Sequence, residues 1–149
     1  MSDTARLLLT AAVLSGLSIG LFSWRLSRID PTQPERLIGE LRLSQIAAVL
    51  LATMGAMPAG LALAAGPAPG ANFDAAIGIA FIVLAGFLLF RHPREALLIA
   101  FGGFLTHAFV DLAHRPGLLS PEVVPRWYAV ACATYGLYLA AVCYWARRH

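Results

Sequence analysis

The chain has 149 residues, of which 59% are hydrophobic and only 13% charged, and its mean hydropathy is +0.73. So apolar a composition is typical of an integral membrane protein, and it excludes a soluble enzyme with a large polar cleft. The net charge of +3 is spread over short segments, with a basic run only at Arg147-Arg148-His149. We therefore expect the lipid bilayer to surround this chain, and we expect no nucleic acid among its partners.

Five apolar runs are each long enough to cross a bilayer, which takes about 20 residues of helix. The sequence therefore predicts an all-α bundle of five transmembrane helices that forms a single membrane domain over residues 1–149. The predicted spans are 7–24, 46–65, 71–90, 95–114 and 127–145, separated by Pro, Gly or Arg residues. The first run ends in Trp24-Arg25 rather than in small residues, so we expect it to be retained rather than cleaved as a signal peptide.

The distribution of Arg residues predicts how the bundle is oriented, because basic loops stay in the cytoplasm. Eight lie on one side (Arg25, Arg28, Arg36, Arg42, Arg91, Arg94, Arg147 and Arg148) and three on the other (Arg6, Arg115 and Arg126). The N-terminus is therefore expected outside and the C-terminus in the cytoplasm, as in a multi-pass protein of a cell inner membrane.

The connection between the first two spans contains a segment, 34–45, with the pattern of an amphipathic helix. Pro34 is suited to the first turn, and the apolar and charged residues fall on opposite faces: Leu37, Ile38 and Leu41 on one, Glu35, Arg36 and Glu40 on the other. We expect this segment to lie along the cytoplasmic membrane surface before the chain turns into the second span. The alternative is that it docks a partner.

Small residues recur at every fourth position of the first two spans: Ala12, Gly16 and Gly20, then Ser44, Ala48, Ala52, Ala56, Gly60 and Ala64. Such ridges let helix backbones approach closely within a membrane. We interpret them as packing surfaces inside the bundle, the alternative being a surface for a membrane protein partner or for a homo-oligomer. Pro58 leaves the carbonyl of Met54 without its helical donor, which predicts a kink in the second span.

Polar residues interrupt the apolar background in the fourth span. His107, Asp111 and His114 follow an i, i+4, i+7 spacing and share one helix face within about 60°. A carboxylate inside a membrane costs roughly 2.5 to 3.5 kcal/mol, so it needs a partner, a water-filled cavity or a function. The pattern predicts an outward-facing site for a transition metal, copper or zinc, or for haem, within a redox or metal-handling membrane system. Residues expected near the same depth or side are further candidate ligands: Asp74, Met57 and Cys132.

Several alternatives stay open for these residues. His107 can be satisfied by a hydrogen bond to Asp111 or Thr106, and Asp111 can form an ion pair with Arg115. In that case the chain is a non-catalytic accessory subunit of a larger membrane complex. A third possibility is a membrane enzyme in which His107 and Asp111 are an acid/base pair acting on a lipid or isoprenoid, in a cavity between the third, fourth and fifth helices.

The Asn72-Phe73-Asp74 entry to the third span and the Gly-rich third and fourth spans resemble DoxX-like small bacterial membrane proteins. The resemblance covers residues 41–147 and rests on hydropathy and small-residue spacing, without a diagnostic motif. It implies a four-helix unit with an accessory role beside a membrane redox enzyme. The additional N-terminal span departs from that pattern, and no functional residue is carried over.

Overall fold

A computed structural model of the chain describes residues 3–66, 69–114 and 124–148. The described residues form five α-helices: α1 (Asp3–Leu26), α2 (Pro34–Ala65), α3 (Ala71–Leu88), α4 (Pro93–Ala113) and α5 (Arg126–Arg148). Each is long and apolar enough to cross a membrane, so the prediction of an all-α chain with five such helices is confirmed. Four of them agree with the predicted spans to within a few residues, and α2 begins twelve residues earlier because it includes the segment 34–45.

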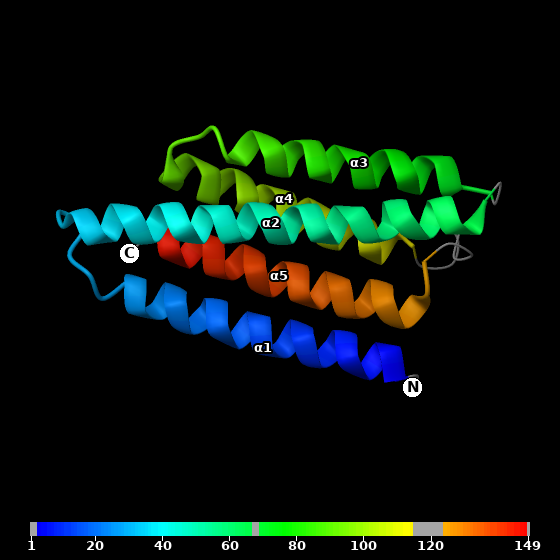
Figure 1. Cartoon of the computed structure of the whole chain (residues 1–149), viewed down its shortest axis with the longest axis horizontal. Coiled ribbons are helices and arrows are strands. Elements are labelled where there is room, and N and C mark those ends of the chain that lie inside the picture. Colours follow the sequence, from blue (N-terminus) through cyan, green and yellow to red (C-terminus); the bar gives the residue numbers. More distant parts are fainter. Residues whose placement is uncertain (1–2, 67–68, 115–123, 149) are drawn as a thin grey trace.

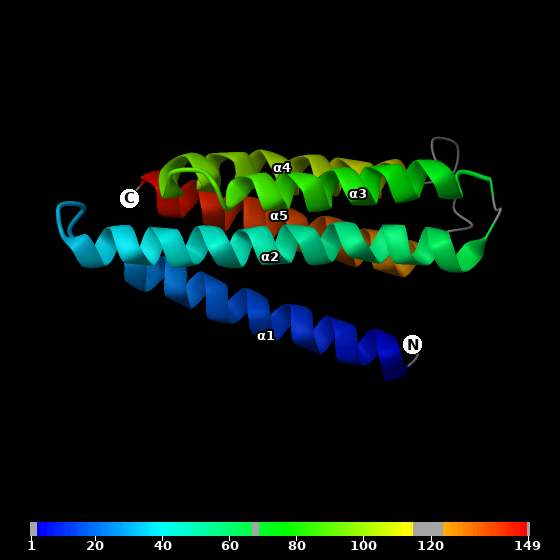
Figure 2. The ribbon, with the colours of Figure 1, turned by 45° about the horizontal axis from the view of Figure 1, so that its top comes forward.

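The helices lie side by side and alternate in direction along the long axis of the molecule (Figure 1). One end of the bundle, here called the N-terminal end, holds the start of α1, α3 and α5 and the end of α2 and α4. The other end, the C-terminal end, holds the opposite termini. α1 lies at the edge of the bundle, and its axis diverges from that of α2 toward the N-terminus of α1 (Figure 2). It is also the least buried helix, with 11% of its apolar window inside the bundle against 33 to 44% for the others.

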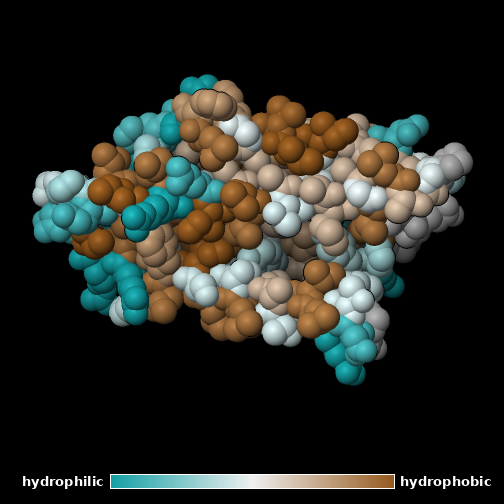
Figure 3. All heavy atoms as spheres, in the orientation of Figure 1, coloured by the Kyte–Doolittle hydropathy of each residue, from teal (hydrophilic) through white to brown (hydrophobic). Residues whose placement is uncertain are grey.

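The surface is apolar along the middle of the bundle and hydrophilic at its two ends (Figure 3). Large apolar side chains are exposed on each helix, among them Leu14, Val49, Val83, Phe109 and Leu137. A water-soluble protein of this size does not leave so much apolar surface uncovered, whereas lipid-facing helices do. The structure thus has the form of a multi-pass membrane protein.

The start of α2 corrects the prediction for residues 34–45. The segment is helical as expected, but it continues without a turn into the second span, so the separate surface helix is wrong. The structure also decides which of its two faces is buried: Arg36 and Glu40 are each 1% exposed, whereas Leu37 and Ile38 are about half exposed. Within a bundle surrounded by lipid, the charged face turns toward the protein interior and the apolar face turns outward.

A buried ionic network closes the C-terminal end of the bundle. Arg36 Nε donates to Glu40 Oε1 at 2.9 Å, and Arg94 Nε, from α4, donates to Glu40 Oε2 at 3.0 Å. The terminal nitrogens of Arg36 donate to the carbonyl oxygen of Leu26 and, at 2.8 Å, to that of Ala146. These carbonyls belong to the last turns of α1 and α5, where helical donors are lacking. One side chain therefore ties α2 to the ends of two other helices.

Part of the predicted small-residue ridges packs inside the chain. Tyr138 of α5 lies against Gly16 of α1, and its hydroxyl donates to the Gly16 carbonyl at 2.8 Å. The close approach of α2 and α3 is made by two glycines outside the predicted ridges. A Cβ added at Gly78 would lie 2.5 Å from the carbonyl oxygen of Gly55, and one added at Gly55 would lie 2.7 Å from that of Gly78, so both positions need glycine. The ridge expected on α2 is only partly internal, because Ala56 and Gly60 are exposed.

Candidate metal site

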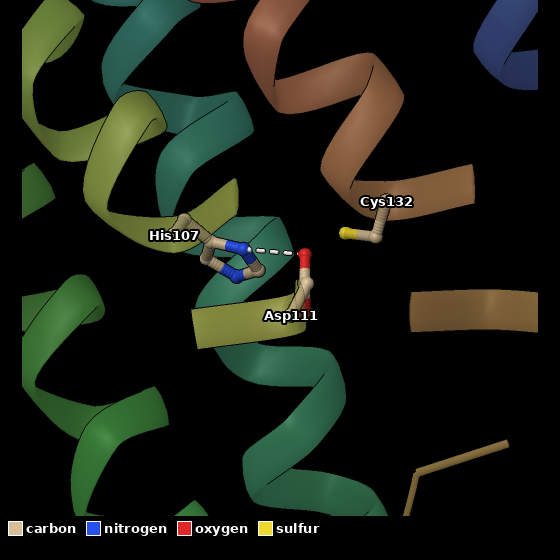
Figure 4. Close-up of side chains that lie close together, drawn as sticks. All are labelled: His107, Asp111 and Cys132. Carbon is tan, nitrogen blue, oxygen red and sulfur yellow. Dashed lines mark hydrogen bonds and ion pairs between the residues drawn. The ribbon is translucent and has the colours of Figure 1, made fainter. Parts of the chain in front are cut away.

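Three predicted candidates meet in the half of the bundle nearer the N-terminal end (Figure 4). His107 and Asp111 lie one turn apart on α4, and Cys132 faces them from α5. His107 Nδ1 is 3.0 Å from Asp111 Oδ2, and the nitrogen, carboxylate oxygen and sulfur atoms of the three residues all lie within 4.8 Å of one another. All three are buried, with exposed fractions of 1, 5 and 8%.

The position of His107 depends on a proline in a different helix. Pro58 has no N–H, so the carbonyl of Met54, four residues earlier in α2, lacks its helical donor. His107 Nε2 lies 3.1 Å from that carbonyl oxygen. The Phe81 ring of α3 packs beside the imidazole, with the ring centroids 4.6 Å apart. α2 shows no sharp bend, so the predicted kink is not seen, and a side chain supplies the missing hydrogen bond instead (Figures 1 and 2).

These contacts determine the tautomer of His107. A carbonyl oxygen only accepts hydrogen bonds, so Nε2 carries a proton and donates it to Met54. Nδ1 then faces the carboxyl group of Asp111, and one proton is shared along that contact. The pair is either imidazolium with carboxylate or imidazole with carboxylic acid, and its net charge is zero in both forms. This neutrality is what makes two ionisable side chains tolerable in the apolar interior.

The third residue of the α4 stripe, His114, belongs to a separate pair. Its Nε2 lies 2.8 Å from Asp74 Oδ1 at the start of α3, and its Nδ1 lies 2.9 Å from the carbonyl oxygen of Val110. His114 and Asp74 are 7 and 3% exposed. The structure therefore keeps His114 and Asp74 out of the cluster around His107 and uses them to join α3 and α4 at the N-terminal end. The alternative partner of Asp111, Arg115, lies outside the described residues.

A cleft of about 200 Å³ between α1, α2 and α5 borders one member of the cluster, Cys132. Its lining includes Cys132, Tyr128 and Met57, so the thioether of Met57 borders this cleft and is not one of the three clustered groups. Tyr128 lies one turn before Cys132, with its hydroxyl 3.9 Å from the sulfur. The cavity expected for a lipid-processing enzyme was placed between the third, fourth and fifth helices, and this cleft opens on the other side.

The sequence did not reveal two parts of this site. The sequence predicts that Cys132 lies at the depth of His107, but it favours His114 over Cys132 as a ligand. Helical spacing relates residues of the same helix and does not determine how the neighbouring helix is rotated about its axis. The contact between His107 and the Met54 carbonyl was also missed. The freed carbonyl below Pro58 was the signal that was available to find it.

Comparison of the chain with protein-family models, with curated proteins and with solved structures found no match. The resemblance to DoxX-like proteins thus stays a prediction.

Proposed function

We propose that this protein is a multi-pass inner-membrane protein, with the N-terminus outside and the C-terminus in the cytoplasm, that binds one divalent transition-metal ion in its outward half. The ligands are His107 Nδ1, a carboxylate oxygen of Asp111 and the thiolate of Cys132, and the ion is zinc or copper. The convergence of these three buried ligand atoms carries the proposal. We propose that this site serves a redox or metal-handling membrane system.

The spacing of the donor atoms fits a transition metal. Zinc binds nitrogen, oxygen and sulfur ligands at about 2.0 to 2.3 Å in tetrahedral geometry, which places two ligands of one ion about 3.3 to 3.8 Å apart. The ligand atoms of the cluster all lie within 4.8 Å of one another, so binding needs a contraction of at most about 1.5 Å. Three protein ligands also leave a fourth coordination position open, as in zinc sites that act on a substrate.

Charge balance favours a divalent ion over a monovalent one. Binding displaces one proton from the Cys132 thiol and the proton shared between His107 and Asp111. The ion with one thiolate, one carboxylate and a neutral imidazole has no net charge, so the interior stays neutral before and after loading. Copper(I) in the same site would leave a buried negative charge, which is costly in an apolar medium.

We do not extend the proposal to haem. The His107 ring is 1% exposed with Phe81 against it, so a macrocycle beside the imidazole would have to displace packed side chains.

Metal content of the purified full-length protein tests the proposal. We expect about one equivalent of zinc or copper by elemental analysis in the wild type, and near-zero content in His107→Gln, Asp111→Asn and Cys132→Ser. Cys143→Ser is the matched control, because Cys143 is a buried cysteine of the same helix outside the cluster. His114→Gln should keep its metal. A wild type without metal after incubation with zinc and with copper would overturn the proposal, as would equal binding by the Cys132 and Cys143 variants.

A second variant tests the contact that orients His107. Pro58→Ala restores an N–H that competes for the Met54 carbonyl, which frees His107 Nε2 and loosens the ring. Loss of such an outer partner typically lowers metal affinity 10- to 100-fold. We expect a decrease of that size in zinc competition titrations while the helix content is unchanged. Unaltered affinity would mean that the Met54 carbonyl does not hold the ligand in place.

A second candidate function is supported by the cleft that borders Cys132 and Tyr128. Here a lipid or isoprenoid enters between α1, α2 and α5 as far as Cys132, and the His107–Asp111 pair, which is next to Cys132 but does not line the cleft, acts on it as acid and base. Ala131→Trp would fill the cleft without touching the pair. Mass spectrometry of lipids that copurify with the protein should then show an isoprenoid or lipid in the wild type and not in this variant. Identical lipid profiles would exclude this candidate.

A further inference from the structure

A second cleft lies at the C-terminal end, at the opposite end of the bundle from the metal site. It has a volume of about 340 Å³ and lies between the connection of α1 to α2 and the first turns of α2 and α4. The residues used below that line it are Gln33, Arg36, Leu37, Glu40, His92 and Arg94.

The charges of the residues that line this cleft do not cancel. Arg36 and Arg94 together contribute two positive charges, and Glu40, which lies between them, contributes one negative charge. Asp30 and Glu35 are close in the chain but do not line the cleft, and Glu95 of the first turn of α4 pairs with Arg91. Arg94 is 47% exposed and bonds to Glu40 only through Nε, so its two Nη groups form no hydrogen bond among residues 3–66, 69–114 and 124–148. The lining residues therefore carry one net positive charge, and the Arg94 guanidinium group has donors to spare.

The two helices that start at the cleft add to this positive potential. α2 begins after Gln33 and α4 begins after His92, and neither of these residues makes a side-chain hydrogen bond to the first-turn amides. The N-terminus of a helix carries a partial positive charge. Guanidinium donors and helix N-termini are both suited to a phosphate oxygen.

One apolar residue that lines the cleft is exposed, and two more lie close to lining residues in the chain, which favours a lipid over a free anion as the ligand. Leu37 lines the cleft and is 50% exposed, Ile38 beside it is 51% exposed, and Phe90, two residues before His92, is 88% exposed. A soluble anion gains nothing from such neighbours, whereas acyl chains attached to a bound phosphate would lie against them. Basic pockets at the cytoplasmic ends of membrane helices are suited to anionic headgroups.

We propose that this cleft binds the phosphate group of an anionic phospholipid, from the cytoplasmic leaflet in the orientation proposed above. The Nη groups of Arg94 donate to the phosphate oxygens, and His92 lies at the edge of the same cleft. The acyl chains pack against the exposed apolar face of Leu37 and Ile38. The negative charge of the bound phosphate then balances the one net positive charge that Arg36, Arg94 and Glu40 leave together.

Lipid binding by the full-length protein tests this proposal. The probe is dioleoylphosphatidylglycerol, titrated into detergent-solubilised protein, with dioleoylphosphatidylcholine and inorganic phosphate in parallel, and retained lipid is counted by native mass spectrometry. Arg94→Gln should weaken apparent affinity for phosphatidylglycerol about tenfold, the usual effect of losing one charge-assisted contact. Arg91→Gln is the matched control, because Arg91 is also an exposed arginine at this end but pairs with Glu95 and lies over Phe87.

His92→Glu separates lipid binding from folding. His92 takes no part in the Arg36 network, and a carboxylate at a helix N-terminus is favourable for the helix, so the melting temperature without lipid should not fall. The same carboxylate repels a phosphate, so phosphatidylglycerol binding should weaken about tenfold or more. Wild-type affinity in both Arg94→Gln and His92→Glu would overturn the proposal. So would equal retention of phosphatidylcholine, or binding of inorganic phosphate that phosphatidylglycerol does not displace.

Discussion

Arg36 offers the sharpest test of how this bundle is held together. Its guanidinium group is buried at 1% exposure and bonds to Glu40, to the Leu26 carbonyl and to the Ala146 carbonyl. Replacing Arg36 by Met keeps most of the volume but removes these donors. Glu40 then keeps only its contact with Arg94. The variant thus leaves the buried carboxylate with Arg94 as its one remaining partner and removes one donor from each of two helix ends, although the Leu26 carbonyl still accepts from the Ile29 N–H.

These lost contacts set the expected decrease in the free energy of unfolding. Removing one partner of a buried ion pair costs about 3 to 5 kcal/mol, mainly because the other charge stays behind. Arg94 still pairs with Glu40, so we expect the lower limit, about 3 kcal/mol. The double change Arg36→Met with Glu40→Met removes the buried carboxylate as well and leaves Arg94, which is half exposed, without that partner. It should cost only about 1 to 2 kcal/mol, from the lost Arg36 hydrogen bonds to the two carbonyls.

The free energy of unfolding, measured by SDS titration in mixed micelles, checks both values. Arg42→Met is the matched control, because Arg42 is an exposed arginine of the same helix and should change stability by less than about 0.5 kcal/mol. The reasoning would be refuted if Arg36→Met cost less than about 1 kcal/mol. It would also be refuted if the double variant were less stable than the single one.

The remaining predictions concern helix packing and the second His–Asp pair. Gly78→Ala places a Cβ 2.5 Å from a backbone oxygen of α2 and should lower the free energy of unfolding by about 1 to 3 kcal/mol in the same SDS titration. A Cβ added at Gly86 meets no atom within 4 Å, so Gly86→Ala should leave that free energy unchanged or raise it by up to about 1 kcal/mol. Equal effects of the two changes would contradict the close approach of α2 and α3. Asp74→Asn weakens the hydrogen bond to His114 from charged to neutral and should lower stability by about 1 kcal/mol with metal content unchanged. Loss of metal in this variant would show that His114 and Asp74 belong to the metal site after all.

The helices themselves were predictable because their cause is local. A run of about 20 apolar residues has to form its backbone hydrogen bonds within itself once it is in lipid, so length and hydropathy define each span. The expected first, third, fourth and fifth spans therefore lie within or close to α1, α3, α4 and α5. The grouping of His107 and Asp111 on one face was equally local, since it depends only on the pitch of α4.

The orientation of each helix about its axis was not predictable in this way. The pattern of residues 34–45 showed two faces but not which one turns inward, and burial of Arg36 and Glu40 depends on the carbonyls and the arginine that other helices bring to them. The same limit applies to Cys132 and His114. Their partners, Asp111 and Asp74, are fixed by the packing of α5 and α3 against α4.

By itself, the sequence determined that the chain forms five membrane-length helices and that α4 carries a polar stripe, because both properties follow from backbone chemistry and helical periodicity. Only the tertiary structure decided that Cys132 joins His107 and Asp111, that His114 pairs with Asp74, and that Pro58 offers the Met54 carbonyl to His107. Such contacts depend on the rotation and depth of neighbouring helices, which are set by close approaches such as that of Gly55 and Gly78.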